Sequence, residues 1–95
     1  MDVNQTQQEV LCIYRFADAV TSDIGHQEAW LSGMALLLSD KSSAAFTSWC
    51  VFHINDIDVM YKKLESRGKV WPGITSAVAW LHSSSYIIAR AHTYS

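Results

Sequence analysis

The sequence predicts a small α+β domain, and three observations favour this fold class. Residues 49–54 (WCVFHI) contain no turn former and are rich in the aromatic and β-branched side chains that suit a packed strand. Residues 56–67 then place apolar side chains at helical spacing. Residues 74–81 and 86–94 each alternate as further strands would. The segment 49–68 therefore predicts a strand followed by an amphipathic helix.

The expected helix has its own start and stop signals. Asn55 and Asp56 can accept hydrogen bonds from the free amides of the first helical turn. Arg67 suits the negative end of a helix, and Gly68 can adopt the left-handed conformation that follows one. The buried face is expected to consist of Ile57, Met60, Tyr61 and Leu64, and the pair Asp58–Lys62 has favourable i,i+4 spacing.

The rest of the chain is expected to form one domain over residues 1–95, with a frayed start. Residues 10–16 favour a strand, although Thr6 and Glu9 have the spacing of a helical capping box and keep a helix open there. The frayed start covers residues 1–8. A loop is expected over 17–32, with a short helix at 27–31, followed by a strand at 34–40 and a connection at 41–48. Another strand is expected to start at 70–71, and a hairpin turn is expected at 82–85.

One compositional fact favours a different fold. The chain has only four glycines and one proline, about half the usual share, whereas a five-stranded domain normally needs more turn formers. The alternative is an all-α bundle of four or five short helices, over residues 7–21, 27–39, 42–54, 56–67 and 74–92.

Composition also limits the function classes. A formal net charge of −2, with scattered Lys and Arg, gives no electrostatic footprint for nucleic acid. No apolar run reaches the ~18 residues of a membrane span, and the polar N-terminus is unlike a signal peptide, so a cytoplasmic protein is expected. Cys12 and Cys50 lie in apolar patterns and are expected to be reduced and buried.

A family resemblance enters through the pattern F52-x-I54-x-D56-I57-D58-x-x-Y61-x-x-L64-x-x-R67-G68, preceded by GMALLLSD. This pattern resembles the opening of the second module of the glyoxalase/bleomycin-resistance (vicinal oxygen chelate) superfamily, over about residues 33–71. The resemblance implies a βαβββ module with a curved mixed sheet that encloses a cavity, and often a homodimer. A sheet this short would also leave edge strands for a partner to cover.

The departures from that family pattern remove its metal chemistry. The position of the family's metal-binding histidine, five residues before Ile54, is occupied by Trp49. No acidic residue follows Glu65, so the glutamate ligand of the closing strand is missing as well. The four histidines lack zinc-ligand spacing, and the chain has no nucleophile elbow or phosphate-binding loop. We therefore expect no catalytic residue, no metal site and no cofactor.

The aromatic residues give the strongest functional hypothesis, because large rigid side chains with a polar tip suit a binding pocket. On the predicted strands, side chains that share a face are candidates for lining such a pocket, and we expect ligand binding by Trp49, Val51, His53, Trp80, His82, Tyr86 and Arg90.

The sequence thus predicts a non-catalytic protein that binds a small aromatic molecule, in the manner of drug-sequestering relatives, and that forms a homodimer. One alternative is a small protein-interaction module or inhibitor from a mobile element or phage. Another is a degenerate metal-dependent lyase or dioxygenase.

Overall fold

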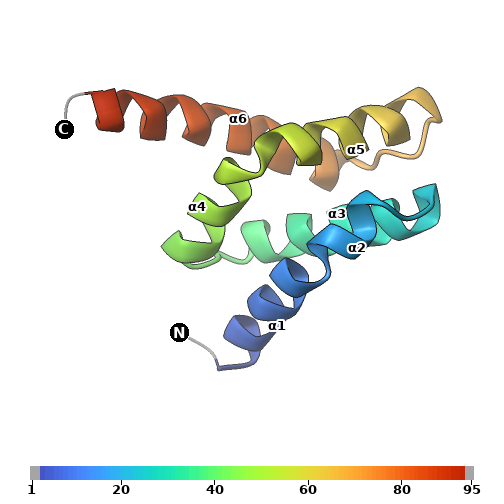
Figure 1. Cartoon of the computed structure of the whole chain (residues 1–95), viewed down its shortest axis with the longest axis horizontal. Coiled ribbons are helices and arrows are strands. Elements are labelled where there is room, and N and C mark those ends of the chain that lie inside the picture. The colour runs from blue at the N-terminus through green and yellow to red at the C-terminus, as the bar shows by residue number, and fades with distance from the viewer. Residues whose placement is uncertain (1–2, 94–95) are drawn as a thin grey trace.

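The computed structural model describes the backbone of residues 3–93 and the side chains of residues 4–85, and the backbone it describes forms helices and no strand (Figure 1). The α+β prediction is therefore wrong, and so is the βαβββ module. The helices are α1 (Val3–Tyr14), α2 (Phe16–Val20), α3 (Ile24–Ser39), α4 (Ala44–Phe52), α5 (Ile54–Ser66) and α6 (Pro72–Thr93).

The segment expected to be the central strand is helical instead. Residues 49–52 complete α4, and after a single turn residue, His53, the chain continues into α5. Ser43 starts α4, because its hydroxyl accepts a hydrogen bond from the amide of Phe46. A short apolar run is compatible with either a strand or a buried helix, and this cap favours the helix. Phe46 and Cys50, one helical turn apart, are both buried.

The other expected strands and turns are also helical, apart from residues 70–71, which lie in the connection between α5 and α6 and form no strand. Residues 10–16 lie in α1, the bend after it and the start of α2, and residues 34–39 belong to α3. Residues 74–81 and 82–85, expected to form a strand and a hairpin turn, both lie inside α6, as do residues 86–93; Tyr94 lies outside the described residues. The apolar residues in 74–81 fit an alternating pattern, but in the structure they form one helical face with four buried side chains: Ile74, Ala77, Val78 and Leu81.

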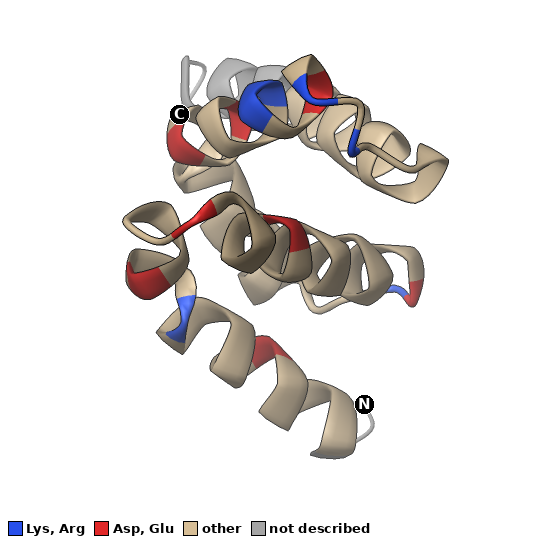
Figure 2. Ribbon diagram, turned by 90° about the vertical axis from the view of Figure 1, so that its right-hand side faces the viewer, with Lys and Arg blue, Asp and Glu red and all other residues tan. Residues whose placement is uncertain are grey.

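Helix α3 lies in the middle of the molecule. It packs against α5 and α6 on one side and against α1 and α2 on the other, while α4 packs against α5 and α6 (Figures 1 and 2). The core lies between these layers, and its largest fully buried apolar side chains are Leu31, Met34, Phe46, Cys50, Ile57, Met60, Leu64, Ile74 and Leu81.

Helix α1 is fixed to this core by polar contacts. The Glu9 carboxylate, only 4% exposed, accepts hydrogen bonds from the backbone N–H and the hydroxyl of Ser43, both at 2.9 Å. The Trp30 indole N–H donates to the carbonyl oxygen of Cys12 at 2.8 Å. Glu9 thus supports the residue that caps α4, which couples the N-terminal helix to the start of another helix 34 residues away.

The expected end of the 56–67 helix is confirmed. Gly68 has φ +66°, its N–H donates to the carbonyl of Glu65, and the N–H of Lys69 donates to the carbonyl of Leu64. These two bonds form a Schellman motif around a left-handed glycine. The expected Asp58–Lys62 pair is present at 3.2 Å, and Ile57, Met60 and Leu64 are buried, with Tyr61 half-buried.

The expected start of that helix is wrong. Asn55 and Asp56 lie inside the first turn of α5 and are exposed. The residue before the helix is His53, which makes no side-chain capping bond. Because α4 runs almost directly into α5, the backbone carbonyl of His53 itself accepts the first helical bond, from the amide of Ile57 at 3.1 Å.

Candidate functional site: two grooves beside α3

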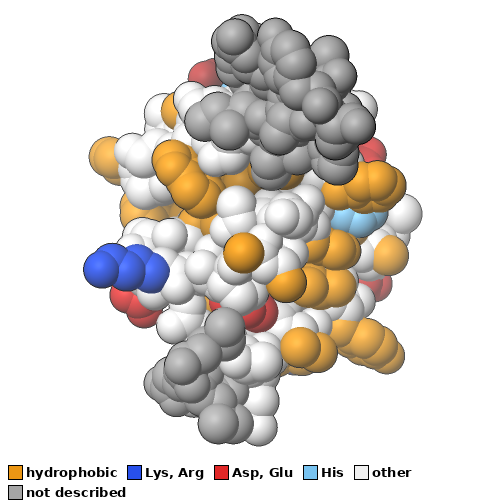
Figure 3. Space-filling view, turned by 90° about the vertical axis from the view of Figure 1, so that its left-hand side faces the viewer, with side chains coloured by type: hydrophobic (Ala, Val, Ile, Leu, Met, Phe, Trp, Pro, Cys, Tyr) orange, Lys and Arg blue, Asp and Glu red, His pale blue; other side chains and the backbone are white. Residues whose placement is uncertain are grey.

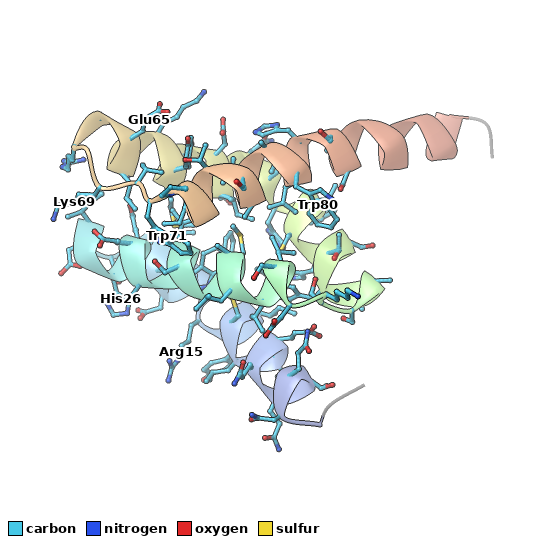
Figure 4. All side chains as sticks on the ribbon, turned by 180° about the vertical axis from the view of Figure 1, so that it is seen from behind. Arg15, His26, Glu65, Lys69, Trp71 and Trp80 are labelled. Atoms are coloured by element: carbon cyan, nitrogen blue, oxygen red, sulfur yellow. The ribbon has the colours of Figure 1, made fainter. Side chains whose placement is uncertain are left out.

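A groove of about 430 Å³ lies between the C-terminal half of α3 and the first half of α6, and we call it the α3–α6 groove. Its volume falls within the range of small-molecule pockets. Figure 4 shows two of its side chains, Trp71 and Trp80, on the same face of the molecule above α3. The groove is lined by Ala35, Leu36, Leu38, Ser39, Trp71, Gly73, Ser76, Ala77 and Trp80.

Trp71 is held in place at one end of this groove. Its indole N–H donates to the hydroxyl of Ser32 at 3.1 Å, which fixes the ring across α3. The ring also lies directly against Gly73, where a Cβ atom would come within 1.8 Å of Cζ3 of Trp71. Pro72, at the first position of α6, suits a helix start because its missing N–H would have no helical partner. Trp71, Pro72 and Gly73 together therefore set the ring orientation.

Trp80 and Leu36 lie along the groove and remain open to water. Trp80 is 48% exposed, Trp71 40% and Leu36 60%. Within the described side chains, the Trp80 indole N–H has no hydrogen-bond partner, so it can donate to an acceptor atom of a ligand. Ser39 and Ser76 supply hydroxyl groups to an otherwise apolar lining.

The helices that form this groove carry almost no charge. Residues 29–39 of α3 and residues 72–89 of α6 contain no Asp, Glu, Lys or Arg. Figure 2 shows the described parts of these stretches as tan ribbon without blue or red. The groove therefore presents an apolar surface and hydroxyl groups to whatever enters it, without a charged side chain of its own.

A second groove, also of about 430 Å³, lies between α1 and α3, and we call it the α1–α3 groove. Its lining is more polar, with Arg15 and His26 at one end and Asp40 at the other. It is lined by Asn4, Gln5, Gln8, Leu11, Cys12, Arg15, His26, Ala29, Trp30, Gly33, Leu36, Leu37 and Asp40. Leu36 forms the ridge that both grooves share.

The structure places three of the expected site residues in or beside an aromatic cluster rather than in either groove. Trp49 contacts the rings of Phe16 (centroid distance 4.9 Å) and His53 (4.4 Å), and it also lies near Trp30 and Phe46 (6.4 Å each). Val51 does not share their face, because two residues along a helix differ by about 200°. The reasoning that grouped Trp49, Val51 and His53 depended on a strand, and it is wrong for that reason.

Trp80 and His82 are separated in the same way. Trp80 faces the α3–α6 groove, whereas Nε2 of His82 lies 3.3 Å from Oδ1 of Asp58 on α5. Partial burial acts to raise the pKa of Asp58, but hydrogen bonds from His82 and Lys62, together with their charges, outweigh it and lower that pKa. The side chains of Tyr86 and Arg90 lie outside the described residues.

The expected ligand-binding residues did not include Trp71 and Leu36, which line the α3–α6 groove. The available signal was the uncharged stretch on each side of the groove, which leaves apolar side chains at the surface without charges between them. Trp71 directly precedes Pro72, and a proline often marks the first position of a helix, so the place of Trp71 at a helix start was also readable. In the structure its carbonyl accepts the first amide bonds of α6.

The described part of the chain offers neither a metal-binding group of side chains nor a reactive thiol. No group of three or more His, Cys, Asp or Glu side chains there could hold a metal ion. Both cysteines are unpaired; burial raises the pKa of Cys12 to about 12 and that of Cys50 further, so both are poor nucleophiles. Of the described helices, none has the length and apolar character to cross a membrane. Comparison with protein-family models, curated proteins and solved structures found no match.

Proposed function

We propose that the protein binds a small, uncharged, planar aromatic molecule in the α3–α6 groove and performs no chemistry on it. The observation that carries this proposal is the pair Trp71 and Trp80, which flank a charge-free groove and remain 40% and 48% exposed. Indole rings offer large flat apolar faces, and aromatic ligands stack on such faces favourably.

The exposed parts of the two rings account for a useful binding energy. A tryptophan side chain presents about 150–250 Å², so covering the exposed part of both removes on the order of 150 Å² from water, or about 4 kcal/mol at 25 cal/mol/Å². The ligand's own apolar area adds to this, while lost translational freedom opposes it. We therefore expect dissociation constants in the micromolar to millimolar range for simple aromatic probes.

The absence of charged side chains supports an uncharged ligand. A charged group moved into this groove would lose hydration without gaining an ion pair, which is costly. A phenol or amide group, by contrast, can bind the hydroxyl of Ser76 or the indole N–H of Trp80.

The test is an NMR titration with 1-naphthol. The chain has four tryptophans, and their indole N–H signals can be assigned by single Trp→Phe substitutions. We expect 1-naphthol to shift the signals of Trp71 and Trp80 and to leave those of Trp30 and Trp49 unchanged. Shifts at Trp30 or Trp49 alone, or no shift at millimolar probe, would overturn the proposal.

A matched pair of glycine variants sharpens the test. Gly73 and Gly25 are each the second residue of a long helix. Gly73→Ala must displace the Trp71 ring, whereas a Cβ atom on Gly25 meets only an ordinary contact with Oδ1 of Asp23 at 3.6 Å. We expect Gly73→Ala to weaken 1-naphthol binding severalfold and Gly25→Ala to leave it unchanged. Equal affinities for the two variants would contradict the assigned role of Trp71.

The homodimer stays a prediction, but its reason changes. The expected sheet edges do not exist among the described residues. Apolar side chains are nevertheless exposed outside the grooves, such as Phe52 (82%) and Val59, and Figure 3 shows hydrophobic side chains along both flanks of the face it presents. Sedimentation equilibrium of the wild-type protein and of Phe52→Ser measures the assembly state directly.

A further inference from the structure

The α1–α3 groove contains a glycine that packing does not explain. Gly33 lies in the interior of α3, where glycine costs about 1 kcal/mol relative to alanine. A Cβ atom at this position would have no heavy atom within 4 Å beyond the helix itself and its neighbours. The bare backbone is therefore not required by a close neighbour among the described residues, and its effect is to keep the floor of this groove open.

The groove is long and follows the helix axes. Its lining on the α1 side runs from Asn4 in α1 to Arg15 just after it, which at 1.5 Å per residue spans about 16 Å. The lining on α3 runs over a similar length, from His26 to Asp40. A volume of about 430 Å³ spread over this length suits an extended chain better than a compact ring system.

The polarity of the lining changes along the groove. Between its ends the lining is largely apolar, with Leu11, Ala29 and Leu37, while Gln8 contributes one amide group. At one end, Arg15, which lies between α1 and α2, and His26 of α3 project on the same side of the molecule (Figure 4).

Arg15 leaves a free cation at that end of the groove. Within the described residues, no carboxylate lies in ion-pair distance of the Arg15 guanidinium, whereas His26 is 3.5 Å from Asp18. A planar guanidinium binds a carboxylate through two parallel hydrogen bonds. Asp40, at the opposite end, disfavours a second anionic group there.

We propose that the α1–α3 groove binds an unbranched monocarboxylate with a medium-length alkyl chain. The carboxylate pairs with Arg15, and the chain lies over Gly33 between Leu11 and Leu37. This site is separate from the α3–α6 groove, and the proposal does not depend on the function assigned to that groove.

Calorimetric titration with decanoate tests the head group. Losing the charge-assisted bonds of the guanidinium should weaken binding about tenfold in Arg15→Gln. Arg67→Gln is the matched control, because Arg67 is an exposed residue at the end of α5, and among the described residues its guanidinium bonds only to the carbonyl of Lys63. We expect 1-decanol to bind more weakly than decanoate and to be insensitive to Arg15→Gln. Equal affinity of decanoate for the two arginine variants would overturn the proposal.

Substitutions of Gly33 test the groove floor. Gly33→Leu fills the open space with a good helix former and should abolish decanoate binding, whereas Gly33→Ala, which adds one methyl group, should retain most of it. Thermal unfolding of both variants checks that they are folded. Unchanged affinity in Gly33→Leu would refute the site.

An NMR titration of the unsubstituted protein separates this site from the other groove. It does not depend on whether Gly33→Leu folds. In the wild-type protein, decanoate should shift the backbone amide of Gly33 and the indole N–H of Trp30, which lines this groove. It should leave the indole of Trp80 unchanged. Shifts at Trp71 and Trp80 alone would place the fatty acid in the α3–α6 groove and overturn the inference, while the 1-naphthol result would still stand on its own.

Discussion

Replacing Trp49 by alanine should destabilise the protein without removing its ligand site. The Trp49 ring is half-buried and contacts Phe16 and His53 at centroid distances of 4.9 and 4.4 Å. A fully buried Trp→Ala change costs about 3–5 kcal/mol, and aromatic pairs add about 0.5–1.5 kcal/mol each. Because Trp49 is partly exposed, we expect Trp49→Ala to lower the free energy of unfolding by about 3 kcal/mol, near the lower end of that range.

Trp80→Ala is the matched control for this substitution. It removes the same side chain from a position that is 48% exposed, and we expect a loss of about 1 kcal/mol. Urea unfolding followed by far-ultraviolet circular dichroism measures both free energies of unfolding. The same variants should behave oppositely toward 1-naphthol, with affinity kept in Trp49→Ala and lost in Trp80→Ala. A Trp49→Ala variant as stable as Trp80→Ala, with weakened naphthol binding, would refute the assignment of Trp49 to the core.

Three further outcomes follow from individual contacts. Glu9→Ala removes both carboxylate bonds to Ser43 and should lower the free energy of unfolding in urea by about 2–3 kcal/mol; a loss below 0.5 kcal/mol would show that this anchor is unimportant. Burial raises the pKa of Cys12 from 9.0 to about 12. The stabilisation that comes from keeping this thiol neutral is therefore complete below pH 9 and should be lost as the pH rises from 9 toward 12. Free energies of unfolding measured across that pH range would detect the loss. Gly68→Ala should destabilise by about 1 kcal/mol because φ is +66°, whereas Gly33→Ala should stabilise by a similar amount; thermal shifts of the same sign would contradict the two glycine assignments.

The fold was predictable where local signals agreed. The Gly68 terminus and the buried face of α5 were readable because a stop residue, a helical apolar spacing and an i,i+4 pair all indicated the same element. The low number of turn formers indicated an all-helical chain, and the alternative boundaries drawn on that basis lie close to those of the structure, although the first expected helix is divided at Arg15.

The main error came from short apolar segments. In residues 49–54 every second and every third or fourth side chain is apolar, so strand and helix spacings are satisfied together. Ser43 caps the helix that contains this segment, and the hydroxyl that forms the cap also donates to the distant carboxylate of Glu9. Such a contact between residues 34 positions apart is not visible in local periodicity.

The candidate site was harder to predict than the fold. Trp80 lines the α3–α6 groove, but the residues expected to share its face came from a strand geometry, and His82 instead lies against Asp58 on α5. The grooves depend on how α3 packs against α1 and α6, which is set by tertiary contacts rather than by any single segment. Trp71 and Gly33 gain their significance only from that packing.

A crystal structure of the complex with 1-naphthol is the most direct test of the proposed function. It should show the naphthol ring between Trp71 and Trp80, over Ala77, with Trp71 still bonded to Ser32. Naphthol bound elsewhere, or the two indoles packed against each other so that the groove is filled, would contradict it.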